Sequence, residues 1–264
     1  MKFKVDHDLH IHSNISLCSF GEDHTPERIL RYAEANGFKK ICLTNHFWDE
    51  RVCKAIPWYN TQNFEHISAA KPLPQSDKVQ FLFGCETEIR HDLVLGISKE
   101  RFEEFDFVLI PTTHLSMENF TITEIEKESF KARADAWVRR LDSVLSSDLP
   151  FHKIGIPHIT CSLVAPQREQ YLEVLKEIPE CDMYRLFKQA AKIGVVIEIN
   201  AQDLIITDDI SPIAVLPYQI AKECGCKFYC GSDAHEAEHL ADAKVRLERA
   251  VDFLELTEDD KFII

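Results

Sequence analysis

The sequence predicts an α/β protein in which parallel strands alternate with helices. Two observations support this fold class. Short runs rich in Val, Ile, Leu and Phe recur along the chain, as buried parallel strands require. Amphipathic segments with helical periodicity lie between these runs. The chain has 264 residues, of which 45% are hydrophobic, and this length suits one domain over residues 1–264.

The predicted strands share a second property, because each ends on side chains suited to a polar site. The first run contains His10-Ile-His12, and the last runs into Asp233-Ala-His235. Residues two apart on a strand point to the same face, so each of these pairs projects together. The runs between them end on His46, Glu86, His114, His158 and Asn200. The carboxyl ends of parallel strands lie on one side of the fold, so these side chains are expected to converge there.

The predicted helices fall between the strands. The first begins at Thr25-Pro26, with proline in its first turn, and ends before Gly37. A long charged helix is predicted over 123–147, with one apolar stripe. The stripe consists of Ile125, Phe130, Ala134, Trp137, Val138, Leu141, Val144 and Leu145. Further helices are predicted over 181–193, 211–224 and 238–254.

Two segments interrupt the alternation and are candidates for shaping a pocket. Residues 48–77 leave the strand end that carries His46 and contain Trp48, Trp58 and Tyr59. Residues 161–179 follow His158. Loops at this end of parallel strands often carry the binding site. The aromatic residues of the first segment are equally suited to packing against the body of the protein.

The residues at the predicted strand ends resemble those of the PHP (polymerase and histidinol phosphatase) superfamily. The resemblance rests on His10-Ile-His12, Thr44-Asn-His46, Gly84-Cys-Glu86, His114, Pro157-His158 and Gly231-Ser-Asp233-Ala-His235. They follow the family's order and spacing over almost the whole chain. The resemblance implies a distorted (β/α)7 barrel of the PHP type, with its metal site at the C-terminal ends of the strands.

The resemblance also implies a ligand set for two to three divalent metal ions. One ion would be surrounded by His10, His12, Glu86 and Asp233. Glu86 would bridge to a second ion held by His114 and His158, and His46 and His235 would serve a third. Zinc is the expected metal, and manganese and iron are also compatible with His and carboxylate ligands.

One position departs from the family pattern. The residue six positions after His12 is normally His or Asp in this family, and here it is Cys18. A thiolate suits zinc better than magnesium or calcium. Three alternatives stay open: Cys18 is a ligand, His24 takes its place, or the third ion is weakly bound or absent.

Three polar side chains near the expected ligands have more than one interpretation. Glu88 lies two residues beyond Glu86, so it is an alternative ligand or a partner that orients a histidine. Glu198 and Asn200 share one face of a strand and are expected to form hydrogen bonds with metal ligands rather than to bind metal.

The charge and the cysteines narrow the functional class. A net charge of −14 argues against an extended nucleic-acid partner, whose phosphates need Lys and Arg, but a small phosphorylated substrate is compatible. The sequence has no signal-peptide pattern and no apolar run of about 20 residues, so neither export nor a membrane partner is expected. The 9 cysteines are dispersed and are expected to be reduced, which favours a cytoplasmic location.

The expected function is a metal-dependent phosphoesterase that hydrolyses a small phosphate monoester, as a histidinol phosphatase does. Divalent cations acidify a bridging water toward neutrality, so hydroxide becomes available to attack phosphorus. The chain has neither a Gly-x-Ser-x-Gly elbow nor a Walker loop. Asp233 and His235 are candidates for protonating the leaving oxygen. Phosphate-binding candidates are Arg51, Arg90 and Arg168, because guanidinium groups match phosphate oxygens.

Two other functions remain open, and the oligomeric state is not predicted. The same strand-end residues would serve a binuclear amidohydrolase that acts on an amide, ester or lactone. Such enzymes usually bridge their metals with Lys or Glu after the fourth strand, and no lysine stands at such a strand end. A noncatalytic metal-binding module is the third alternative, in which Cys18 has disabled one site.

Overall fold

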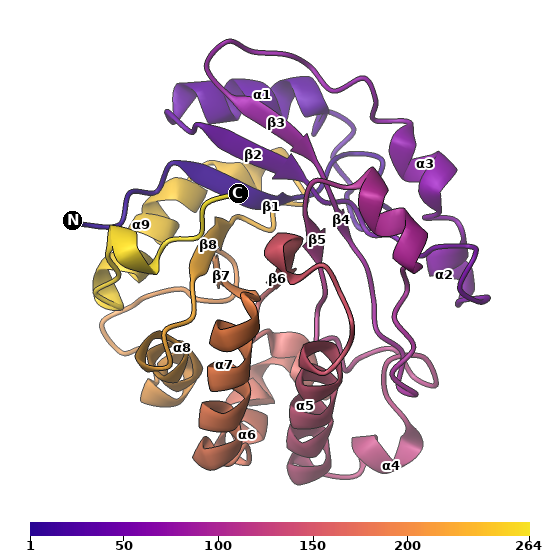
Figure 1. Cartoon of the computed structure of the whole chain (residues 1–264), viewed down its shortest axis with the longest axis vertical. Helices are drawn as coiled ribbons and strands as arrows, with labels where there is room; N and C mark the ends of the chain where they lie inside the picture. Colours follow the sequence, from indigo (N-terminus) through magenta and orange to yellow (C-terminus); the bar gives the residue numbers. More distant parts are fainter.

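The computed structural model describes all residues from 1 to 264, and its strands form two parallel sheets (Figure 1). The first sheet contains, in order, β1 (His7–Ile11), β2 (Lys40–Leu43) and β3 (Gln80–Phe83). The second contains β4 (Cys85–Glu86), β5 (Val108–Leu109), β6 (Ile154–Ile156), β7 (Val196–Asn200) and β8 (Phe228–Gly231). Every pair of neighbouring strands is parallel, which confirms the predicted α/β class.

The two sheets meet at both of their edges. Only Gly84 separates β3 from β4, and a Cβ atom there would collide with the Phe107 carbonyl and lie 2.7 Å from Cys42 Sγ. Glycine is therefore required where the chain crosses from one sheet to the other. On the opposite side, an isolated parallel bridge between Ile11 and Ala234 joins the end of β1 to the residues after β8. Isolated bridges rather than continuous ladders connect the sheets, so the closed seven-stranded barrel is not observed as such.

The longer helices follow the strands in the expected alternation. They are α1 (Pro26–Ala35), α5 (Phe130–Leu145), α7 (Glu180–Ile193), α8 (Pro212–Glu223) and α9 (Ala243–Phe253). Figure 1 shows α5, α7 and α8 side by side below the second sheet. Thr25 caps α1 by accepting a hydrogen bond from the Arg28 amide, and the predictions for 181–193 and 211–224 are confirmed.

Shorter helical segments lie in the connections. The α-helical ones are α2 (Pro57–Asn60), α3 (Phe64–Ser68), α4 (Glu124–Lys127) and α6 (Tyr171–Lys176). The 3-10 turns are Lys99–Glu104, Phe151–Lys153, Ser162–Val164, Arg168–Gln170, Ala237–Leu240 and Glu258–Asp260. The helix predicted over 238–254 therefore begins later than expected, at Ala243, after a 3-10 turn.

The prediction of a single helix over 123–147 is wrong. The segment divides into α4 and α5, because Ser129 adopts an extended conformation and its side chain accepts a hydrogen bond from the Ala132 amide. A serine in this role starts a new helix. Ile125, which was assigned to the apolar stripe, lies on α4 with 73% of its surface exposed, whereas Trp137 and Leu141 on α5 are buried as expected.

The core has an outer part and an inner part. The larger cluster unites 61 buried residues, many of them between the helices and the strands. A smaller cluster draws its side chains from strands of both sheets: Leu9, Cys42, Leu82, Phe107, Leu109, Val196 and Tyr229. Gly155 on β6 makes room for it, since a Cβ atom there would lie 2.7 Å from Tyr229 and 2.8 Å from Phe107. This packing fixes the strands whose ends carry the polar residues.

Two expectations about covalent and membrane features can be compared with the structure. All nine cysteines are free, as predicted. None of the helices combines the length and the apolar character needed to cross a bilayer.

Candidate metal centre

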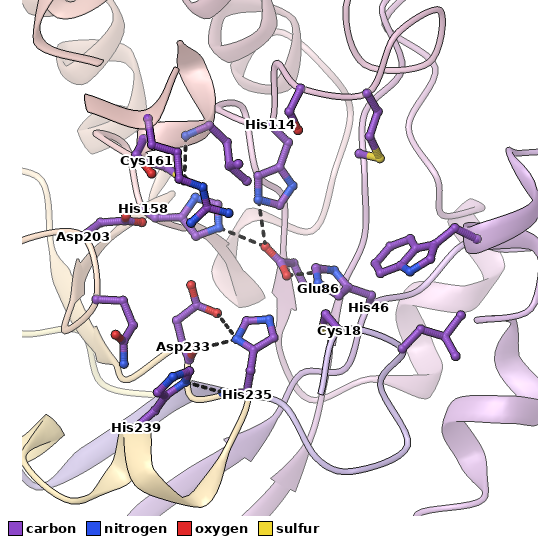
Figure 2. A pocket seen from close by; sticks show the side chains of 18 of the residues that line it. Cys18, His46, Glu86, His114, His158, Cys161, Asp203, Asp233, His235 and His239 are labelled. Carbon is purple, nitrogen blue, oxygen red and sulfur yellow. Dashed lines mark hydrogen bonds and ion pairs between the residues drawn. The ribbon is translucent and has the colours of Figure 1, made fainter. Parts of the chain in front are cut away.

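The side chains at the strand ends converge around Glu86, which ends β4 (Figure 2). Its Oε1 atom lies 3.0 Å from His158 Nε2 and 3.9 Å from His114 Nε2. Its Oε2 atom lies 3.0 Å from His46 Nδ1 and 3.5 Å from His12 Nε2. Burial raises the pKa of Glu86, but the charge of His46 and a hydrogen bond from His10 outweigh it and hold that pKa well below its usual range.

Asp233, just after β8, forms a second focus of the cluster. Its Oδ1 atom lies 3.3 Å from the Nε2 atoms of both His10 and His12, and 3.5 Å from His235 Nδ1. Asp233 has a φ angle of 52°, and His158 has one of 34°. Residues other than glycine rarely adopt positive φ, and such strain concentrates at functional sites. The backbone is therefore strained at two positions whose side chains point into the cluster.

Three of the histidines are oriented by a partner on Nδ1. His10 Nδ1 donates to Glu198 at 2.8 Å, and His114 Nδ1 donates to Glu88 at 2.8 Å. His158 Nδ1 forms a hydrogen bond with the Thr113 hydroxyl at 2.9 Å. In each case Nε2 is left facing Glu86. Histidines that bind metal ions are typically held in this way by a carboxylate or another hydrogen-bonding group.

These contacts decide two of the open interpretations. Glu88 orients His114 and receives a hydrogen bond from Arg140 at 3.0 Å, so it does not take the place of Glu86 at the centre of the cluster. Glu198 and Asn200 lie beside the expected ligands as predicted. Asn200 Nδ2 donates to Glu198 at 2.9 Å and lies 3.5 Å from Asp233.

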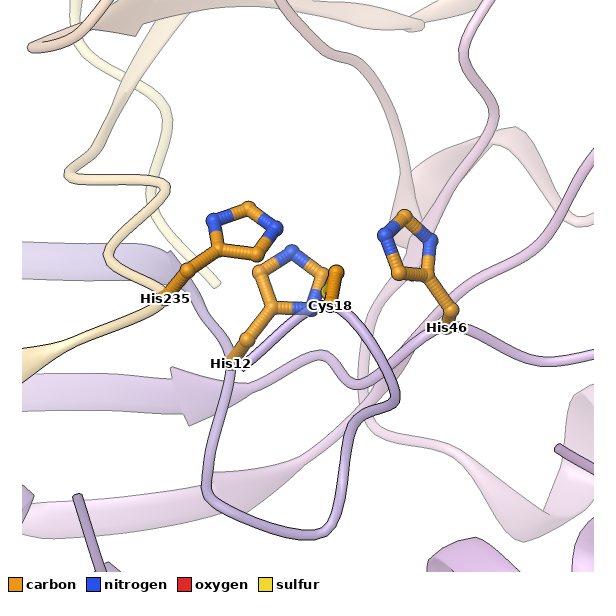
Figure 3. A group of neighbouring side chains, drawn as sticks. All are labelled: His12, Cys18, His46 and His235. Carbon is orange, nitrogen blue, oxygen red and sulfur yellow. The ribbon is translucent and has the colours of Figure 1, made fainter. Parts of the chain in front are cut away.

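Cys18, in the loop between β1 and α1, joins three histidines (Figure 3). The donor atoms of His12, Cys18, His46 and His235 all lie within 4.8 Å of one another. Burial raises the pKa of the Cys18 thiol, but His46 and His235 more than compensate, and the pKa falls to about 6. His24 is not part of this group, and its Nε2 lies 3.4 Å from the Ala234 carbonyl.

The donor set fits divalent metal ions. Five groups of His, Cys, Asp or Glu have donor atoms close enough to hold one, and together they include every expected ligand. The Nε2 atoms of His10 and His12 lie 3.2 Å apart, and both lie 3.3 Å from Asp233 Oδ1. Two imidazole nitrogens and a carboxylate oxygen that face one another in this way are arranged as the ligands of one cation. The mixture of nitrogen, carboxylate and thiol donors suits zinc.

A cavity of about 880 Å³ opens over the cluster. The residues that line it include Ile56 and Trp58 from the first interrupting segment, and Cys161 and Arg168 from the second. Both interrupting segments, 48–77 and 161–179, therefore contribute to the pocket. Aromatic residues of the first segment also pack in the interior, as the alternative interpretation predicted, because Trp48 and Tyr59 form a buried cluster with Phe120.

The three candidate arginines occupy different places. Arg168 lies exposed on the cavity wall. Arg51 and Arg90 are not among the lining residues, and the Arg90 guanidinium is paired with Asp92 at 2.5 Å. Asp203, which also lines the cavity, was not predicted from the sequence. Its burial raises the pKa of its carboxyl group to about 6. Its spacing of three residues from Asn200, at the end of β7, was the available signal.

A model of the PHP domain matches residues 8–202. The chain belongs to this family. Its fold is similar to that of the Lactococcus lactis histidinol phosphate phosphatase, solved with zinc, L-histidinol and phosphate. The TM-score is 0.57 and the identity 17%, over 93% of this chain and 94% of that chain. A protein from Listeria monocytogenes assigned as a histidinol phosphatase gives a TM-score of 0.58 and 14% identity, over 89% and 97%. No curated protein matches the sequence.

Proposed function

We propose that this PHP-domain protein is a metal-dependent phosphoesterase that hydrolyses a small phosphate monoester. The observation that carries the proposal is the cluster around Glu86 and Asp233, which opens into a cavity large enough for such a substrate. Membership of the PHP family supports it. The likeness of its fold to a phosphatase solved with zinc and phosphate is consistent with it.

We assign two to three divalent ions to the cluster, with zinc preferred and manganese or iron as alternatives. Their ligands are His10, His12, Cys18, His46, Glu86, His114, His158, Asp233 and His235. Ions bound there would supply hydroxide near neutral pH and offset negative charge on the phosphoryl group. We further propose that the two sheets form the distorted (β/α)7 barrel of this family, which brings all nine residues to one end.

The chain's own side chains would bind and orient the substrate. Arg168 is the best placed of the candidate arginines, because it lines the cavity and forms no ion pair, so its guanidinium is available to phosphate oxygens. Glu198, Glu88 and Thr113 hold the histidine rings in position. Asp233 and His235 are proposed to deliver a proton to the leaving oxygen, and His235 is the more accessible, with 24% of its side chain exposed against 15% for Asp233.

The location and partners follow from the same account. We propose that the enzyme acts in the cytoplasm, because a reducing compartment suits nine free cysteines. Its partner would be a small phosphorylated molecule rather than an extended nucleic acid, in keeping with the net charge of −14.

The test is a substrate panel of phosphate monoesters, lactones and amides, assayed on zinc-, manganese- and iron-loaded protein. We expect phosphate release from one or more monoesters, a loss of at least about 100-fold in Glu86→Gln, and no change in His152→Asn, whose histidine lies exposed outside the cluster. Turnover of lactones or amides alone would instead identify an amidohydrolase.

A further inference from the structure

The loop between β1 and α1 holds the Cys18 thiol against three imidazole rings, and Cys18 also lines the cavity (Figure 3). The donor atoms of His12, Cys18, His46 and His235 lie within 4.8 Å of one another. Histidine binds a metal ion as a neutral imidazole, whereas cysteine binds it as a thiolate. Cys18 is therefore the only member of this group that brings a negative charge to an ion. Without its thiolate, the group would offer neutral donors alone.

Contacts on both sides of Cys18 fix its position in the loop. The Leu17 amide donates a hydrogen bond to Gln62 Oε1 at 3.1 Å, and Gln62 is fully buried. The Ser19 hydroxyl donates a hydrogen bond to the carbonyl oxygen of His235. The loop is thus anchored to the body of the protein before Cys18 and to the strand end that carries a proposed ligand after it. The fold itself holds the sulfur beside the imidazoles.

Cys18 differs from the other cysteines in combining access from solvent with metal-binding neighbours. It is half-buried and lines the cavity, so small solutes can reach its sulfur. Cys161 lines the cavity too, but it is buried, and its thiol donates a hydrogen bond to the Asp203 carboxylate, whose charge disfavours a thiolate. Cys53 is half-buried like Cys18, but it belongs to none of the groups that could hold a metal ion. Oxidation of cysteine requires both thiolate character and access, and Cys18 has both.

We propose that Cys18 is a site of oxidation by hydroperoxides, and that this modification releases the metal ion held by His12, Cys18, His46 and His235. The thiolate sulfur attacks one peroxide oxygen, an S–O bond forms and the O–O bond breaks. The products are a sulfenic acid and hydroxide, so the sulfur is oxidised by two electrons and the peroxide is reduced by two. The ion then loses the only anionic ligand of its group. This inference rests on the proposed metal centre and phosphoesterase function, and it adds a means of regulating them.

The test exposes zinc-loaded protein to hydrogen peroxide and measures free zinc with a chromogenic chelator, beside phosphate-monoester hydrolysis. A sample without peroxide corrects for zinc that the chelator removes by itself. The wild type is expected to release about one ion per chain and to lose turnover, and both should recover after treatment with a thiol reductant and fresh zinc. Dimedone, which reacts with sulfenic acids, should label Cys18 and leave Cys161 unlabelled when the peptides are mapped.

Cys18→Asp is the decisive variant, because aspartate brings the same negative charge without an oxidisable atom. Relative to its own zinc content before peroxide, it should release zinc at least about tenfold more slowly than the wild type. Cys53→Ser is the matched control and should release zinc as fast as the wild type, since Cys53 lies outside the cluster.

The outcomes separate this inference from the proposed function. Wild-type protein that hydrolyses a monoester and keeps all its zinc in peroxide overturns the inference alone. Equal rates of release in Cys18→Asp and the wild type overturn it as well, and so does a label found on Cys53 instead of Cys18. The peptide mapping and the comparison with Cys53→Ser decide the matter even where Cys18→Asp binds less zinc. Wild-type protein that takes up no zinc contradicts the metal centre and the proposed function themselves.

Discussion

The guanidinium of Arg140, on α5, donates to the carboxylate of Glu88 at 3.0 Å, and both side chains are fully buried. Glu88 in turn accepts a hydrogen bond from His114 Nδ1 at 2.8 Å. Arg140 also donates to the backbone carbonyls of Thr112 and Ile89, at 3.0 and 2.8 Å. A helix on the outside of the sheet is thereby connected through one ion pair to a proposed metal ligand.

Replacing Arg140 should destabilise the fold. Arg140→Gln leaves the Glu88 carboxylate buried without its guanidinium partner, and the expected loss is about 3–5 kcal/mol in the free energy of unfolding. The neighbouring Arg139→Gln is the control, because the Arg139–Glu126 pair is partly exposed and is worth about 0–1 kcal/mol. Denaturant unfolding of both variants measures the difference. Equal effects would mean that the buried pair has no special role.

Replacing Glu88 should weaken metal binding. Glu88→Gln preserves the shape of the side chain but removes the charge that holds His114, so the affinity for one metal ion should fall by about 10–100-fold. Competition with a chromogenic chelator measures this affinity directly. The account of Glu88 fails if the variant binds metal as tightly as the wild type.

Cys18 should be a ligand that spectroscopy can detect. Cobalt-loaded protein should show a sulfur-to-cobalt charge-transfer band that is absent in Cys18→Ala, because only a bound thiolate gives this absorption. Metal content should fall from about three ions per chain to about two. His24→Ala should retain both the band and the metal, since His24 lies outside the group formed by Cys18. The opposite pattern in the two variants would assign the site to His24.

Much of this site was predictable, because short motifs at the ends of the strands carry its residues. The pair His10 and His12 shares a strand face by spacing alone, and strand ends of parallel sheets meet on one side. The role of Arg140 as the buried partner of Glu88 was not predictable. Arg139 beside it has the same side chain, and only the tertiary packing determines which of the two is buried. The break in the helix at Ser129 was missed for a similar reason: serine occurs both inside helices and at their N-caps.

Gly231→Ala should disturb the metal centre. A Cβ atom at this position would collide with Glu198 Oε1 and lie 2.6 Å from His10 Cβ, so Glu198 must move away from His10. We expect reduced metal content and a lower melting temperature. Gly21→Ala is the control, because its Cβ atom would meet nothing closer than 3.4 Å. Normal metal content in Gly231→Ala would show that the position of Glu198 is not required.

Acid stability should depend in part on Asp6. Burial raises the pKa of Asp6, but hydrogen bonds with His7 and Lys261 outweigh it and hold the pKa below its usual value. A depressed pKa in the folded state adds stability above the unfolded pKa, and this is lost as the pH falls. Asp6→Asn should therefore lose less stability than the wild type as the pH falls from roughly 5 to 2. Parallel pH profiles of unfolding free energy would contradict this role.

The most direct test of the central claim measures metal content and phosphate-monoester hydrolysis on the same samples of protein, before chelation, after chelation and after reloading with zinc. The account predicts about two to three ions per chain, activity that disappears with the metal and returns on reloading, and neither full metal content nor activity in Glu86→Gln. Wild-type protein that reloads fully with zinc, manganese or iron and still hydrolyses no monoester would contradict it.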